Sequence, residues 1–451
     1  MGAETDHADV VIIGGGVVGC AIFRRLAIAG LKPLLLECGA DILSGASKGN
    51  SAILHTGFDA PTGSLEVACM QAGYREYISI HEKLNLPLME TGALVVAWDE
   101  AQAQRLPGIV AQAHANGVAD VAQISREEVL RREPHLAGHA LGAVFVPREH
   151  LIDPWSAPLA YALQGIAHGG RIRRGCTVTG GKFHGRWSLD TSQGEITAGI
   201  VINAAGNHGD WVEAICRPSP FKVTPRKGQF VVFDKPAARL IKSIILPVPT
   251  ERTKGIVICR TVFGNVIVGP TAEDQEERDI SAVDHDMLEM LVAKGRELLP
   301  GLSDVGVNAL YAGLRPATQF KDYQIEALAD RSWITVAGIR STGLTAALGI
   351  AAHVTDLISK HFKPLADAEP IWTPVPNLCE ERPRPYQDAG SEIVCHCEWV
   401  TRGEIAAAFE GPLPAGDVGG LKRRTRAMMG RCQGFYCSAN VAAIAQYRLK
   451  L

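Results

Sequence analysis

The sequence lacks a strong excess of charge of either sign, and it lacks any apolar run long enough to span a bilayer. It holds 45 Lys and Arg residues against 48 Asp and Glu, a formal net charge of −3. Bulk binding of nucleic acid requires a basic surface, so this balance gives no case for a nucleic-acid partner. Residues 1–9 contain no apolar signal region. We expect a cytoplasmic protein, with peripheral docking to the inner face of a membrane left open.

A disulfide framework is also absent. The chain has 11 cysteines, an odd number, and seven of them are scattered along the sequence. This distribution is typical of a reducing compartment, where most thiols are small core residues. With 451 residues, 47% of them hydrophobic, the chain can bury a large core and should divide into two or three domains.

A glycine-rich turn follows the first apolar run, 10–13, and precedes a helical stretch over 20–29. Strand, glycine turn and helix in this order suit the pyrophosphate of a dinucleotide. Gly14 permits the tight turn, Gly16 lets the backbone approach the phosphates, and Gly19 allows close packing of the helix. Glu37 ends the second apolar run, at the distance where a carboxylate accepts from a ribose hydroxyl. We predict cofactor contacts at Gly14, Gly16, Val18, Gly19 and Glu37.

Further segments indicate a flat cofactor and a second domain. Residues 45–57 are rich in small and hydrogen-bonding residues and have little periodicity, so this loop can pass close to a flat ring. Two later apolar strands end in small residues, at 204–206 and at 338–345, and the second precedes a helix predicted over 346–360. Two other stretches, 85–150 and 218–325, alternate short β-rich runs with helices, which predicts a mostly antiparallel sheet domain inserted into the nucleotide fold.

These landmarks in this order resemble the FAD-dependent oxidoreductases of the D-amino acid oxidase superfamily, in the branch of glycerol 3-phosphate and L-2-hydroxyglutarate dehydrogenases. The resemblance covers roughly residues 8–360, including GASKGNSAILHTG, VINAAG, GLRP and AGIRSTGLTAALGIA. It implies an α/β fold: a Rossmann-like FAD-binding domain (1–84, 151–217 and 326–362) with a substrate domain (85–150 and 218–325). It further implies that the cofactor contacts include Ser47, Asn50, Ser51, Ala205, Gly206, Gly338, Arg340, Ser341, Thr342, Gly343, Leu344 and Thr345.

The end of the chain reads as a separate small module. Six prolines between 364 and 385 predict an extended linker over 363–390. Beyond it, over 391–451, Thr401 and Glu404 form a capping box before a helix over 405–409, and a second helix is predicted over 421–429, ended by Gly430. A domain of this size usually has too small a core to fold alone, and a bound metal provides the missing stability.

Four cysteines supply candidate metal ligands: Cys395 and Cys397 as C-x-C, and Cys432 and Cys437 as C-x-x-x-x-C. Four thiolates can hold zinc or a [2Fe–2S] cluster, and a thiol switch is the third alternative. The segments CHCEWVTRGEI and LKRRTRAMMGRCQGFYC resemble bacterioferritin-associated ferredoxin-like [2Fe–2S] domains, and this resemblance favours the cluster. The expected C-terminal part is therefore a small α-helical [2Fe–2S] domain.

The two cofactors together predict a dehydrogenase. A flavin accepts a hydride and releases electrons singly, and a cluster accepts them one at a time. We expect electrons to pass to a partner protein or a quinone, in a possible homo- or hetero-oligomer; a purely structural cluster is the alternative.

The resemblance also places three side chains near the substrate. His55 can take a hydroxyl proton, while Arg315 and Arg340 can bind a carboxylate or phosphate; Lys227 is a weaker candidate. The predicted substrate is a small anionic secondary alcohol, either a polyol phosphate like glycerol 3-phosphate or a 2-hydroxy acid. After His55 the chain reads Thr-Gly-Phe-Asp, whereas glycerol 3-phosphate dehydrogenases carry an arginine and a tyrosine there. An amino acid or amine dehydrogenase, a non-catalytic electron-transfer protein within a larger complex, and a redox sensor with a degenerate flavin fold are the alternatives.

Overall fold

The first apolar run forms the central strand of a mostly parallel sheet. In the computed structural model, which describes residues 6–249, 255–383, 392–446 and 448, β1 (Asp6–Ile13) pairs in parallel with its two neighbours. Val10, Val11 and Ile12 are fully buried, as expected for a strand covered on both faces. The sheet runs in the order β10 (Val178–Phe183), β11 (Trp187–Thr191), β12 (Gly194–Asn203), β1, β2 (Pro33–Glu37), β9 (Arg171–Arg174), with β20 (Trp333–Ala337) beside β12 and β19 (Gln324–Leu328) beside β20.

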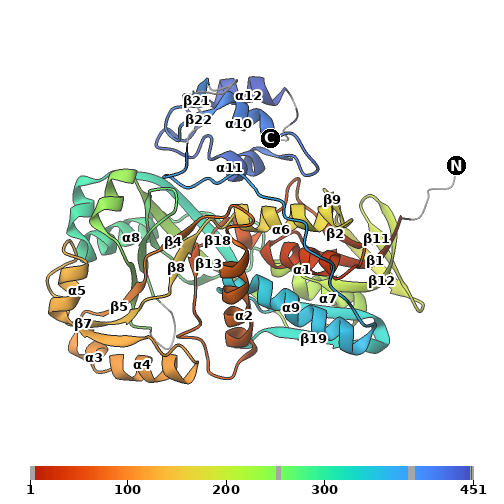
Figure 1. Cartoon of the computed structure of the whole chain (residues 1–451), viewed down its shortest axis with the longest axis horizontal. Coiled ribbons are helices and arrows are strands. Elements are labelled where there is room, and N and C mark those ends of the chain that lie inside the picture. Colours follow the sequence, from red (N-terminus) through yellow and green to blue (C-terminus); the bar gives the residue numbers. More distant parts are fainter. Residues whose placement is uncertain (1–5, 250–254, 384–391, 447, 449–451) are drawn as a thin grey trace.

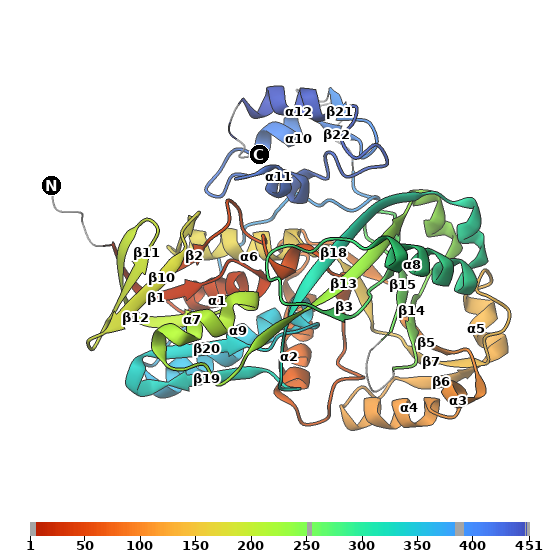
Figure 2. The ribbon, with the colours of Figure 1, turned by 180° about the vertical axis from the view of Figure 1, so that it is seen from behind.

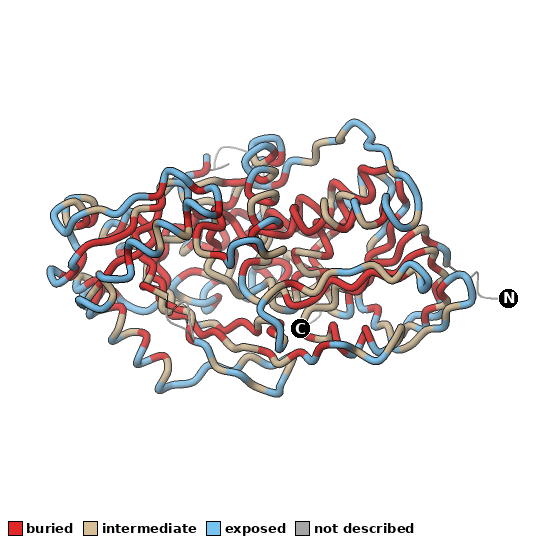
Figure 3. The backbone as a smooth tube through the Cα atoms, turned by 90° about the horizontal axis from the view of Figure 1, so that it is seen from below, coloured by how far each residue is buried: buried red, intermediate tan, exposed pale blue. Residues whose placement is uncertain are grey.

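Helices cover both faces of this sheet and complete what we call the nucleotide domain (Figure 1). Val10 and Ile12 point to the core shared with α1 (Val17–Ile28), α2 (Leu65–Ile80), α6 (Ser156–Ala167) and α9 (Gly343–His361). Val11 and Ile13 point to the other face, where α7 (Gly209–Cys216) packs. The tube coloured by burial shows this layering, with buried stretches inside and exposed loops at the periphery (Figure 3).

A second, mostly antiparallel sheet of nine strands forms the sheet domain. Its order is β17 (Glu273–Asp274), β13 (Val223–Phe233), β16 (Val266–Gly269), β15 (Val257–Arg260), β14 (Ile244–Pro247), β5 (Ala93–Ala97), β7 (Gly142–Val146), β6 (Ala122–Ser125), with β18 (Val307–Thr318) also on β13. β14 and β5 pair in parallel, against the antiparallel trend of the sheet. Its helices are α3 (Glu100–Ala103), α4 (Leu106–Ala115), α5 (Arg126–Arg132) and α8 (His285–Leu298), and short 3₁₀ turns lie at Lys235–Leu240 and Pro300–Asp304. The predicted fold class is thus confirmed.

Three short strands join the two domains. β3 (Ile53–Leu54) and β4 (Leu88–Glu90) both pair antiparallel with β8 (His150–Ile152). β3 belongs to the segment predicted to lie along a flat cofactor, and a 3₁₀ turn over Ala46–Lys48 precedes it. The sequence did not predict these elements, because strands of two or three residues carry too little periodicity.

The proline-rich stretch is extended as predicted, but it is not a free spacer. Its described part has no regular structure and packs on the larger domains, with Val375 and Leu378 buried. Backbone hydrogen bonds attach it at Ala368 to Ile28 (2.8 Å) and at Glu380 to Val262 (2.9 Å).

Residues 392–446 form the cysteine module, which has a core of its own. It contains β21 (Ile393–Cys395), β22 (Val400–Thr401), α10 (Arg402–Ala407), α11 (Val418–Thr425) and α12 (Ser438–Ala445). The predicted capping box of Thr401 and Glu404 is present. The predicted second helix was wrong at both ends: α11 begins at Val418 and ends before Arg426, which adopts a left-handed conformation (φ 70°). The module lies across the two larger domains (Figures 1 and 2).

Within the described ranges, no helix is both long enough and apolar enough to cross a membrane.

Candidate cofactor and active site

The glycine turn lies at the carboxyl ends of β1 and β12, and close packing excludes side chains from it. A Cβ on Gly14, whose φ is 115°, would lie 2.4 Å from the carbonyl oxygen of Ala204. A Cβ on Gly19 would lie 1.9 Å from the carbonyl oxygen of Gly14. Helix and strand therefore meet at backbone distance, and the turn leaves the helix N-terminus open to a pyrophosphate.

Glu37 lies directly against this turn. Its side chain is buried and accepts hydrogen bonds from the backbone N–H groups of Gly15 (2.8 Å) and Gly39 (2.7 Å). The carboxylate is thus held at the end of β2, beside the turn, where the sequence predicted a ribose contact. The role itself stays a prediction.

The loop predicted to follow the flavin is held to both domains. The hydroxyl of Ser47 accepts from the N–H of Val17 (2.9 Å), at the first residue of α1. Asn50 donates to the carbonyl of Ser47 (3.1 Å), and its own carbonyl accepts from the hydroxyl of Tyr311 on β18 (2.8 Å). Ser51 is half-buried. The loop therefore runs between the α1 end of the nucleotide domain and the face of the sheet domain.

The two later motifs reach the same region. Ala205 and Gly206 follow β12, and Gly206 needs its positive φ of 55°. After β20, Gly338 (φ 75°) turns the chain toward α9, which begins at Gly343, three residues earlier than predicted. Arg340, Ser341, Thr342, Leu344 and Thr345 therefore lie in the turn and first helical residues. Gly343 lies opposite Val18 of α1, since a Cβ there would be 3.9 Å from a Val18 methyl group.

His55 pairs with a buried carboxylate that the sequence did not predict. Its backbone N–H donates to Thr345 (3.0 Å), and its Nδ1 lies 2.7 Å from Oε2 of Glu149, which is fully buried. Glu149 also accepts from the backbone N–H (2.6 Å) and the hydroxyl (2.8 Å) of Thr56. Because a carboxylate only accepts, Nδ1 is the donor in this hydrogen bond, and in the neutral ring Nε2 is then the nitrogen that can accept a proton.

The predicted cationic side chains lie on different elements. Arg315 on β18 shares a sheet face with Tyr311, since both occupy alternate positions of one strand, and donates to the carbonyl of Thr271 (2.6 Å). Burial, and then the nearby charge of Arg226, lowers the pKa of Arg315 to about 10. Arg340 donates to the carbonyl of Lys321 (2.7 Å). Lys227 lies on the opposite face of β13 and pairs with Glu273. No hydrogen bond or ion pair described for the structure joins either arginine to His55.

The four predicted ligands of the cysteine module gather in two contacting pairs. Cys395 ends β21 and meets Cys437, which directly precedes α12, while Cys397 meets Cys432. Backbone N–H groups, that of Tyr436 foremost, lower the pKa of Cys432, whereas burial raises the pKa of Cys437 to about 12. Among the described residues no group of three or more ligand side chains surrounds a single metal position. Two neighbouring thiol pairs can supply the four thiolates of a [2Fe–2S] cluster.

Comparison with known proteins identifies the family. Residues 9–357 match the family of FAD dependent oxidoreductases (DAO), and residues 393–446 match the BFD-like [2Fe-2S] binding domain. The chain is an FAD-dependent oxidoreductase of the DAO family. Its cofactors are FAD and a [2Fe–2S] cluster, as the sequence predicted.

Relatives match both parts of this oxidoreductase. A glycerol 3-phosphate dehydrogenase from Caloramator mitchellensis is 32% identical over 97% of this chain and 93% of its own. One of the subunits of the anaerobic glycerol-3-phosphate dehydrogenase of Escherichia coli (strain K12) is 25% identical over 98% of this chain and 89% of its own. An FAD-bound L-alpha-glycerophosphate oxidase from Mycoplasma pneumoniae superposes with a TM-score of 0.76 at 27% identity, covering 83% of this chain and 99% of that structure.

A first prediction concerns the FAD turn. Gly19→Ala places a Cβ against the carbonyl of Gly14, and such overpacking typically destabilises by about 1–3 kcal/mol. We expect a lower thermal midpoint and a lower flavin-to-protein ratio, measured by absorbance. Gly108→Ala is the control, because a Cβ at Gly108 meets nothing within 4 Å. Full flavin occupancy in Gly19→Ala would contradict the assigned turn.

A second prediction concerns the cluster. Anaerobically purified protein should contain about two irons per chain, and Cys432→Ser should lose them, because the cluster takes four thiolates. Cys379→Ser, a half-buried cysteine outside the module, is the control and should keep its iron. Iron and zinc are measured by mass spectrometry. Stoichiometric zinc, or unchanged iron in Cys432→Ser, would overturn the ligand set.

Proposed function

We propose that this enzyme is a dehydrogenase that oxidises a small anionic secondary alcohol, with glycerol 3-phosphate as the first candidate and a 2-hydroxy acid as the second. The first rests on the Caloramator mitchellensis relative, which matches nearly the whole chain including the module. The second rests on an L-2-hydroxyglutarate dehydrogenase of Caenorhabditis briggsae, 28% identical over 71% of this chain. The segment after His55, which lacks the arginine and tyrosine expected for glycerol 3-phosphate, keeps the second candidate in view.

The observation that carries the proposal is the pair of His55 and Glu149. Glu149 fixes the ring through Nδ1 and leaves Nε2 as the nitrogen that takes the hydroxyl proton of the substrate. The imidazolium that forms is stabilised by the carboxylate it already contacts. FAD, when bound, accepts the hydride and passes electrons on singly. Arg315, a desolvated cation on the face of β18 that meets the FAD-following loop, supports an anionic substrate. Arg340 is proposed as a second anion contact.

We further propose that electrons leave through the [2Fe–2S] module to an external acceptor, a protein or a quinone. The Escherichia coli relative is itself named as one subunit of an enzyme, which supports assembly with partner subunits. The proposed location is the cytoplasm or the inner face of a membrane.

The direct experiment is anaerobic addition of substrate to the holoenzyme. Glycerol 3-phosphate and L-2-hydroxyglutarate are compared with glycine and proline, and loss of the visible absorbance of oxidised flavin is followed. We expect bleaching by one of the two anionic alcohols. Faster bleaching by an amino acid would make the protein an amino acid dehydrogenase, and no bleaching by any substrate would favour a non-catalytic role in electron transfer.

A third prediction tests Arg315. Loss of a charge-assisted contact typically costs about 1.5–3 kcal/mol, so Arg315→Ala should lower kcat/KM by at least about tenfold with FAD retained. Arg226→Ala is the matched control: it lies directly opposite on β13, but its guanidinium is already paired with Asp274 (2.7 Å). Equal values of kcat/KM in Arg315→Ala and in the wild type would contradict an anion site on this strand.

A fourth prediction tests Glu149. Glu149→Gln keeps the size of the side chain but removes the charge that stabilises the protonated ring, so kcat should fall at least about tenfold with little change in KM. Thr56→Val removes one hydroxyl donor to Glu149 and should have a much smaller effect on kcat. Flavin content and the circular dichroism spectrum report folding. A KM effect without a kcat effect would assign Glu149 to binding rather than to positioning His55.

A further inference from the structure

The cysteine module is fastened to the nucleotide domain by a buried ion pair. Arg424 of α11 donates two hydrogen bonds to Asp41 (2.5 and 2.9 Å), which is fully buried. Arg174 and the backbone N–H of Gly416 also donate to this carboxylate (3.3 and 3.1 Å). Burial alone would raise the pKa of Asp41, but the hydrogen bonds, chiefly from Arg424, outweigh it and the pKa is lowered. Such a pair forms only when the module is seated.

Small residues bring the module to backbone distance at the same place. A Cβ on Gly416 would lie 2.0 Å from the carbonyl oxygen of Ala40, and one on Gly420 would lie 1.7 Å from Asp41. The loop after Glu37, the residue predicted to contact the ribose of FAD, therefore packs directly against α11.

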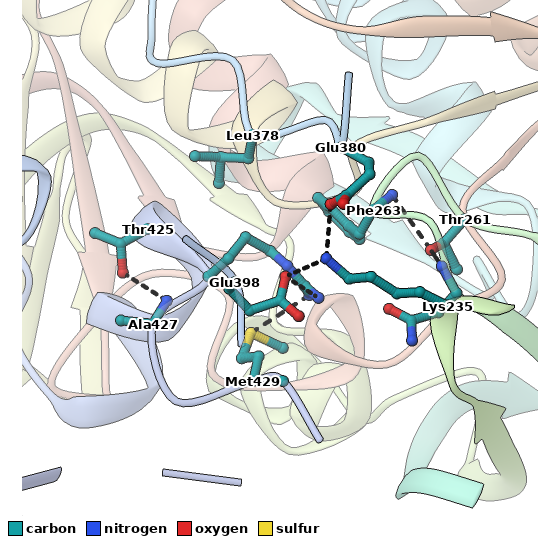
Figure 4. A network of polar contacts seen from close by, with 12 residues as sticks. Lys235, Thr261, Phe263, Leu378, Glu380, Glu398, Thr425, Ala427 and Met429 are labelled. Carbon is teal, nitrogen blue, oxygen red and sulfur yellow. Dashed lines mark hydrogen bonds and ion pairs between the residues drawn. The ribbon is translucent and has the colours of Figure 1, made fainter. Parts of the chain in front are cut away.

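Arg426, two residues after Arg424, holds the module to the sheet domain. Its guanidinium lies 4.1 Å from the ring centroid of Phe263, in the turn between β15 and β16, and 5.9 Å from that of Trp155. It also donates to Glu398 (3.2 Å), which pairs with Lys235 of the sheet domain (3.4 Å). Figure 4 shows Lys235 between Glu398 and Glu380, with Phe263 nearby. Arg426 and Glu398 are each only 4% exposed.

This contact connects the cluster ligands to the FAD-following loop. Glu398 is the direct neighbour of Cys397 in the chain. Phe263 stacks on Trp155 with ring centroids 5.2 Å apart, and the indole of Trp155 donates to the carbonyl of Lys48 (3.2 Å). Lys48 follows Ser47, which is bonded to the start of α1. A continuous set of packed groups therefore runs from the cluster side of the module to the loop at the flavin.

We propose that the [2Fe–2S] module is seated in one fixed position by Arg424 and Arg426, and that it receives electrons across the contact of Arg426 with Phe263 and Trp155. The proposal rests on the proposed function, in which substrate leaves two electrons on the flavin. These electrons pass singly, each reducing one ferric iron of the cluster to ferrous, and the protons lost by the flavin go to water. A one-electron acceptor outside the chain reoxidises the cluster between the two transfers.

The seating is tested on the full-length protein by hydrogen exchange and small-angle scattering. Asp41→Asn strands Arg424 without its countercharge, and breaking a buried pair is strongly destabilising, so exchange of the α11 amides should rise at least about tenfold and the radius of gyration should grow. Arg424→Gln removes the other partner of the same ion pair, so the seating can still be tested if one variant folds poorly. Unchanged exchange and scattering in both variants would overturn the fixed seating.

The electron contact is tested without any substrate. Illumination in the presence of EDTA reduces the bound flavin, and freeze-quenched electron paramagnetic resonance follows the reduced cluster. Phe263→Leu and Trp155→Leu should slow appearance of the cluster signal severalfold, with iron and FAD content unchanged. Phe435→Leu is the control, because this aromatic residue lies in the Cys432–Cys437 loop but is 81% exposed and outside the contact. Wild-type rates in both contact variants would contradict the proposed electron route. Because no substrate is used, this result does not depend on whether the proposed substrate is right.

Discussion

The charge of Asp41 is the constraint on which the arrangement of this enzyme depends. A fully buried carboxylate is expensive unless it is paired and hydrogen-bonded. Arg424 and the N–H of Gly416 both reach it from the module, whereas Arg174 reaches it from the nucleotide domain. Removing the module would therefore leave Asp41 underpaired. The loop after Glu37 and the seated module are therefore coupled through the side chain of Asp41.

A second constraint, strand register, builds the active site. β3 pairs antiparallel with β8, with Ile53 opposite Leu151 and Leu54 opposite His150. The next positions along this register are His55 and Glu149, so the pairing itself brings base and carboxylate together. This small sheet is also where the two larger domains meet. The proposed proton acceptor, His55, is thereby held between the nucleotide domain and the sheet domain.

The sequence was most informative where function is encoded in adjacent residues. The glycine turn, Glu37, the loop around Asn50 and the four cysteines each lie within a short motif, so they could be named from the sequence; their roles stay predictions. Glu149 and Asp41 were missed because their partners lie 94 and 383 residues away and no local pattern marks a buried carboxylate. The end of α11 was misplaced because Arg426 leaves the helix to reach Phe263, a tertiary contact that overrides helix propensity. The proline-rich stretch does not act as a loose tether because its backbone is hydrogen-bonded at Ala368 to Ile28 and at Glu380 to Val262.

The segment after His55 shows how this site differs from the pattern expected for glycerol 3-phosphate. Phe58 is 3% exposed and packs in the core of the sheet domain, and the carbonyls of Gly57 and Phe58 both accept from Asn116. These residues pack into the sheet domain and carry no cationic side chain that could bind a phosphate. The proposed anion contact lies instead on the strand face, where Arg226 is paired with Asp274 while its neighbour Arg315 donates to a neutral carbonyl. Of the two arginines that face each other across β13 and β18, Arg315 is bonded to a carbonyl rather than to a carboxylate, and the proposal therefore gives the anion contact to Arg315.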